Sequence, residues 1–78
     1  MNNNTDTAVR KAFEEWRNDR LAFANYVADL NRMFEPLLEA QEYGKIAHMA
    51  NRAEQLQLIV AESRAALDAA LDAAAGIR

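Results

Sequence analysis

Residues 45–75 read KIAHMANRAEQLQLIVAESRAALDAALDAAA, and this stretch, which holds neither glycine nor proline, decides the fold. Apolar and small residues recur in it and just beyond it at alternating spacings of three and four, at Ile46, Met49, Ala53, Leu56, Val60, Ser63, Leu67, Ala70, Ala74 and Ile77. This spacing is typical of a helix that packs lengthwise against another helix. We therefore predict one long helix here, ended by Gly76 as a left-handed cap.

The first half of the chain carries a matching ladder, with the same alternation of spacings, at Val9, Phe13, Trp16, Arg20, Phe23, Val27, Leu30 and Phe34. Arg20 is the one polar residue in it, so we expect it to interrupt the packed face. Asn, Thr and Asp within residues 4–7 are suitable N-cap residues. We expect residues 1–4 to be a flexible tail and residues 5–78 to form a single domain.

Pro36 and Gly44 divide the two ladders. Proline disfavours the helical conformation of the residue before it, so we predict a break near Glu35 and a short helical connector over residues 36–44, capped by Gly44. The alternative is one kinked helix that runs to Tyr43. Two long helices with a short connection pack antiparallel, so the predicted fold class is an all-α antiparallel hairpin.

Aligning the two ladders in opposite directions places residues across from each other when their numbers sum to about 80. In this register Arg10 lies near Asp68 and Asp72, and Arg17 lies near Glu62. We therefore expect ion pairs between the two helices.

Composition excludes several classes of protein. The 78-residue chain has no cysteine, so it has no disulfides and no thiolate metal site, and the single histidine, His48, has no partners at metal-ligand spacing. We expect no metal and no cofactor. No uncharged stretch is long enough to span a bilayer and the first residues lack the pattern of a signal peptide, so we expect a cytoplasmic protein without membrane contact.

A hairpin of two helices has no interior, yet both helices carry wide apolar faces. We predict self-association, with a homodimer that forms a four-helix bundle as the simplest solution. A larger ring of hairpins or a hetero-partner is the alternative. The residues expected in the core or in self-association are Phe13, Trp16, Phe23, Val27, Leu30, Leu56, Ile59, Val60 and Leu67.

The leading functional hypothesis is a non-enzymatic interaction protein that occupies a surface of another protein, with Arg20, Tyr26, Arg32 and Tyr43 as contact residues. No catalytic residues are expected, because the only serine, Ser63, lies about four helical turns from His48.

Two alternatives from other classes remain. Arginines and tyrosines of neighbouring hairpins could bind a small anion such as a nucleotide. A dimer could also bind nucleic acid through a basic stripe, Arg10, Lys11, Arg17 and Arg20, although the net charge of −3 argues against it.

The segment Ala8-Val9-Arg10-Lys11-Ala12-Phe13-Glu14-Glu15-Trp16 resembles the openings of small helical accessory proteins encoded by phages and prophages. The resemblance implies a small protein that binds a host factor and blocks or redirects it. It assigns no functional residue.

Overall fold

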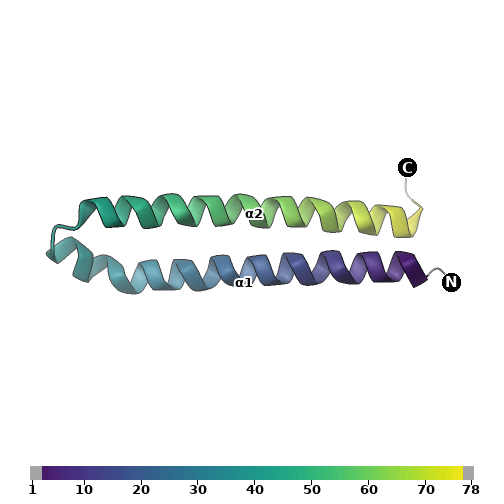
Figure 1. Ribbon diagram of the computed structural model, residues 1–78, viewed down its shortest axis with the longest axis horizontal. Coiled ribbons are helices and arrows are strands. Elements are labelled where there is room, and N and C mark those ends of the chain that lie inside the picture. The colour runs from purple at the N-terminus through teal and green to yellow at the C-terminus, as the bar shows by residue number, and fades with distance from the viewer. Residues whose placement is uncertain (1–2, 77–78) are drawn as a thin grey trace.

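The computed structural model describes residues 3–76 as two helices, α1 (Asn3–Glu39) and α2 (Tyr43–Ala75), joined by residues 40–42. The helices run antiparallel and side by side, so the beginning of α1 and the end of α2 lie at the same end of the molecule (Figure 1). The predicted all-α hairpin is confirmed. We call the end with residues 40–42 the turn end and the other the open end.

The two helices have the register that the ladders predict. Arg64 lies over the Trp16 ring, and residues 6–16 of α1 and 64–74 of α2 line one hollow between the helices, so residues at the same level have numbers that sum to about 80. α1 begins at Asn3, earlier than the expected cap within residues 4–7, and Asn3 and Asn4 belong to the helix rather than to a tail. Residues 1, 2, 77 and 78 lie outside the described part of the chain, and the ladder position Ile77 is among them.

The packed face of α1 departs from the predicted ladder at Phe13, Arg20 and Phe34, whereas Val27 is half-buried, as predicted. Val9, Trp16, Phe23 and Leu30 are half-buried, as expected; Ala12, Asp19 and Tyr26 are half-buried between them, and Leu37, which the predicted ladder did not include, is buried. We call these eight residues the seam of α1. Phe13, Arg20 and Phe34 lie one position further round and are exposed. Arg20 therefore does not interrupt the packing, and the polar seam residue is Asp19.

The predicted ladder of α2 does face α1. Its members from Ile46 to Ala70 are half-buried, except for Leu67, which is buried, and Ala74, nearer the end, is exposed. Near the open end, the small ladder residues Ser63 and Ala70 of α2 stand at the level of the larger Trp16 and Val9 of α1. Large residues against small ones allow close packing of the two helices.

α1 does not break at Pro36, so the predicted break and the helical connector were wrong. The helix runs through Pro36 to Glu39, and the Pro36 carbonyl accepts a normal helical hydrogen bond from the Ala40 amide at 3.0 Å. Proline inside a helix removes one backbone hydrogen bond and crowds the preceding turn. Leu37, the next residue, is one of the two buried side chains, and its burial offsets this cost.

The chain reverses at Gln41, not at Gly44. Gln41 has a left-handed φ of 57°, its amide donates to the Leu38 carbonyl at 3.0 Å, and the Glu42 amide donates to Leu37 at 2.9 Å. This pair of bonds is the Schellman motif that ends many helices, here without the usual glycine. Gly44 lies in the first turn of α2 instead, whereas Gly76 caps α2 with φ 72°, as predicted.

The hairpin is thin. It measures 59 × 18 × 12 Å, and its radius of gyration is 17.5 Å, against about 11.5 Å for a compact domain of this length. Among residues 4–76, whose burial the structure describes, only Leu37 and Leu67 are buried. Neither helix, within these residues, contains a stretch apolar and long enough to cross a membrane.

Candidate functional site: an apolar groove ringed by arginines

Two adjoining hollows form one groove along a single face of the hairpin, in its open half. The larger, of about 680 Å³, lies between residues 6–16 of α1 and 64–74 of α2. The second, of about 400 Å³, continues towards the middle of the molecule between residues 16–23 and 57–64. Trp16 and Arg64 line both hollows. We call the combined feature the groove.

The walls of the groove are formed by the side chains that flank the packed residues of the two helices. Phe13 and Arg20 on α1 lie next to these packed residues, and so do Arg64 and Leu71 on α2, and all four line the groove. Its floor is apolar and is formed by Val9 and Phe23 of the α1 seam and by Leu67 of the α2 ladder. Because Phe13 and Leu71 are 43% and 45% exposed, a single hairpin leaves this apolar surface in contact with water.

Arginines and aromatic rings form a cluster at the centre of the groove. The Phe13 and Trp16 rings lie 5.8 Å apart, tilted by 52°. The guanidinium of Arg17 lies 5.9 Å from the Phe13 ring, and that of Arg20 lies 5.4 Å from the Trp16 ring. Arg64 reaches across from α2 to within 5.8 Å of the same Trp16 ring. These are cation–π distances, each worth about 0.5–1 kcal/mol at an exposed site.

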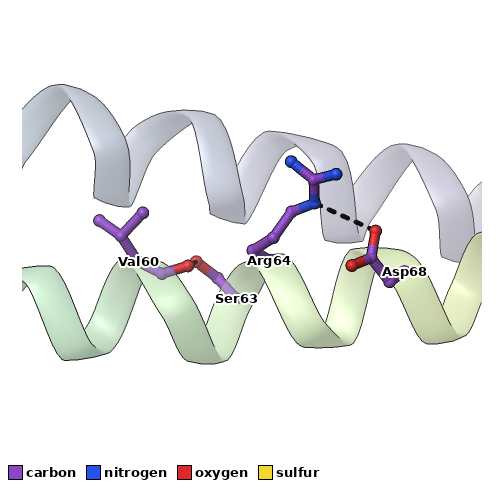
Figure 2. A network of polar contacts seen from close by, with 4 residues as sticks. All are labelled: Val60, Ser63, Arg64 and Asp68. Carbon is purple, nitrogen blue, oxygen red and sulfur yellow. Dashed lines mark hydrogen bonds and ion pairs between the residues drawn. The ribbon is translucent and has the colours of Figure 1, made fainter.

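Arg64 is held in place from its own helix. Its Nε donates to Asp68 Oδ1 at 3.0 Å, and Figure 2 shows the side chain extended along this contact. The hydroxyl of Ser63, the residue before Arg64, donates to the Ile59 and Val60 carbonyls at 3.1 Å. Figure 2 draws Ser63 beside Val60. That hydroxyl is therefore engaged with its own backbone.

The expected ion pairs between the helices do not form. Within residues 3–76 the ion pairs are Arg64 with Asp68 and Arg32 with Asp29, each within one helix. The expectation that Arg10 pairs with Asp68 or Asp72, and Arg17 with Glu62, was wrong although the register is right. Arg17 instead lies over the ring of Phe13, about one turn earlier on the same helix.

The structure does not bring the four expected contact residues together. Arg20 lies in the groove, whereas Tyr43 lies at the turn end and is 60% exposed. Tyr26 is half-buried on the seam, and Arg32 is exposed and paired with Asp29.

The basic stripe is divided as well. Arg10 lines the groove and Arg17 lies against Phe13, while Lys11 is exposed and outside the groove. The sequence reasoning missed Arg64 and Leu71 as groove residues. A signal for them exists in the sequence: Arg64 and Leu71 directly follow Ser63 and Ala70, two members of the α2 ladder.

The residues expected in the core or in self-association range from buried to exposed. Leu67 is buried and Ile59 is 40% exposed. The half-buried members are Trp16, Phe23, Val27, Leu30, Leu56 and Val60.

A separate hollow of about 370 Å³ lies near the turn end and is lined by Met33, Leu37, Gly44, Lys45, His48 and Met49. It contains the only histidine. Within the described chain, no three potential His, Cys, Asp or Glu ligands lie close enough together to hold a metal ion.

Comparisons with known proteins give no relative: no protein-family model matches the chain, and neither a curated protein nor a solved structure is significantly similar to it.

Proposed function

We propose that the chain is a non-enzymatic interaction protein that self-associates and binds the surface of another protein. One observation carries this proposal. Nine large apolar side chains within residues 3–76 are substantially exposed, against two that are buried, and Leu58 on α2 reaches 65% exposure. Soluble proteins rarely leave this much apolar surface uncovered unless a partner covers it.

Three side chains in the groove and at the turn end are of the types that most often anchor protein interfaces. Tyr and Trp supply a large contact area with few rotatable bonds, and Arg adds charged hydrogen bonds, so these three residue types dominate interface energies. Trp16 and Arg20 lie in the groove, and Tyr43 lies at the turn end. Because the helices fix the backbone of these residues before binding, little backbone entropy is lost when a partner docks.

Two further features favour binding over catalysis. The Ser63 hydroxyl is bonded to backbone carbonyls of its own helix. His48 lies in the hollow near the turn end, far along α2 from Ser63. A nucleophile needs a base within hydrogen-bond distance, and these two residues do not supply that pair.

Site-specific photo-crosslinking in the cells that make the chain tests the proposal. A benzophenone amino acid is placed at Leu58, Tyr43 or Phe13, which are exposed apolar positions, and at Asn18, an exposed polar position, as the control. The expected result is an adduct of discrete mass with a different protein from at least one apolar position and none from Asn18. Adducts with a second copy of the chain alone would contradict the heterologous partner.

The arginine cluster favours a second candidate, the binding of a small aromatic anion such as a nucleotide. Arg10, Arg17 and Arg20 form no ion pair within residues 3–76, and two guanidiniums already lie over the Trp16 ring. Titration of nucleotides against the fluorescence of Trp16, the only tryptophan, tests this. Saturable quenching that Arg20→Gln weakens and Arg52→Gln leaves intact would support it, and an unchanged signal would exclude it.

A further inference from the structure

We infer that the groove is occupied by the turn end of a second copy of this chain, giving an antiparallel homodimer in which each copy fills the groove of the other. Phe34 and Tyr43 are the side chains that cover the groove. The inference gives the self-association part of the proposed function a surface and an orientation, and it rests on that part alone.

Exposed area is the first argument. The hairpin exposes 6033 Å², whereas a folded monomer of its mass exposes about 4,800 Å². The excess is about 1,200 Å², and a stable interface of standard size buries about 800 Å² on each partner. A second copy packed along one face removes an area of this size from water.

Position on the hairpin is the second argument. The α1 seam repeats every seven residues from Val9 to Leu37, so residues seven apart keep the same orientation towards α2. Phe34 is therefore on the groove face, because it lies three heptads from Phe13. Tyr43 lies four heptads from Leu71 and shares that face on α2.

The groove face thus has two halves. The open half is hollow, and the turn half carries two exposed aromatic rings, Phe34 at 41% and Tyr43 at 60%. A two-fold axis across the middle of the hairpin places each half against the complementary half of the other copy. Such an isologous contact is closed, so it stops at a dimer.

Charge is the third argument. The groove is lined by Arg10, Arg20 and Arg64, with Asp6 as its single acidic residue. The turn end is acidic, and its exposed charged residues are Glu35, Glu39, Glu42 and Lys45. An antiparallel pair brings the acidic turn end of one copy to the arginine-bearing end of the other, whereas a parallel pair would bring ends of like charge together, which is unfavourable.

Disulfide trapping between introduced cysteines tests the occupant and its orientation, because the natural chain has no cysteine. Phe34→Cys and Leu71→Cys place single thiols on exposed positions of the turn half and the open half. Equal amounts of the two variants are mixed and mildly oxidised, and the adducts are identified by mass. Leu58→Cys, which is exposed but outside the groove, is the matched control.

The expected result is that the mixed 34–71 adduct exceeds both the 34–34 and the 71–71 adducts by at least fivefold, while Leu58→Cys forms none above the background of unfolded chain. Predominance of the 34–34 and 71–71 adducts would overturn the antiparallel orientation. Absence of any adduct, with both variants helical by circular dichroism, would overturn the second copy as occupant. A photo-crosslinked partner protein in that case leaves the proposed binding function standing.

Discussion

The guanidinium of Arg64 on α2 lies 5.8 Å from the centre of the Trp16 ring on α1. It joins the two helices at the point where the two hollows of the groove meet. Arg20 covers the same ring from α1 at 5.4 Å, so one tryptophan holds two cations close together. The antiparallel register therefore brings Arg64 to the Trp16 ring, and this contact places a positive charge at the centre of the groove.

Arg64→Ala is expected to lower the free energy of unfolding by about 0.5–1 kcal/mol, the usual worth of an exposed cation–π contact. Urea denaturation followed by Trp16 fluorescence, at one fixed chain concentration, measures this change. Arg52→Ala is the matched control, because Arg52 is an exposed α2 arginine whose described bond is to Gln55 on the same helix. Equal effects of the two substitutions would contradict a specific contact with Trp16.

Asp19→Leu is expected to raise the free energy of unfolding by about 1 kcal/mol, because an apolar side chain would extend the half-buried seam. Arg20→Leu is not expected to stabilise the hairpin, since it removes a cation from the Trp16 ring. Thermal denaturation of both variants distinguishes the observed seam from the ladder through Arg20. A larger stabilisation by Arg20→Leu would show that the seam assignment is wrong.

Gln41→Gly is expected to stabilise the hairpin by about 1 kcal/mol, because Gln41 adopts the left-handed conformation that costs residues other than glycine energy. Gly76→Ala should have the opposite effect, since Gly76 holds the same conformation at the end of α2. Melting temperatures of the two variants provide the measurement. A lower stability of Gln41→Gly would contradict the Schellman turn at residues 38–42.

Leu37→Ala is expected to cost about 2–3 kcal/mol, because Leu37 is buried and its removal leaves a cavity where α1 ends. Leu38→Ala is the matched control, since the neighbouring Leu38 is 39% exposed and should cost less than half as much. Chemical denaturation of both variants makes the comparison. Similar costs would mean that α1 does not continue in helical register past Pro36.

The fold could be predicted from sequence because the α2 ladder is long, regular and free of glycine and proline. The face of α1 that packs against α2 could not be predicted, because two rows of α1 residues fit the alternation of three and four equally well. One row contains Phe13 and Phe34, and the other contains Ala12 and Tyr26. Counting apolar residues favours the first row, whereas packing against α2 selects the second and leaves Phe13 and Phe34 exposed.

The turn was mispredicted for a related reason. Propensity assigns the left-handed position to glycine, but α1 ends at Glu39 and the left-handed residue is Gln41, three residues before Gly44. The chain accepts a strained Gln41 instead. Of the site, the sequence indicated Arg20 and Tyr43 but not Arg64, because an arginine that crosses to an aromatic ring has no sequence pattern of its own.

Sedimentation equilibrium of the unmodified chain, at concentrations from one to one hundred micromolar, tests self-association most directly. The hairpin leaves its groove and its turn-end aromatics uncovered, so it should form a dimer of twice the 8.8 kDa chain mass, with no larger species because the interface is closed. A single species of 8.8 kDa across that range would contradict self-association and leave the groove to a different partner.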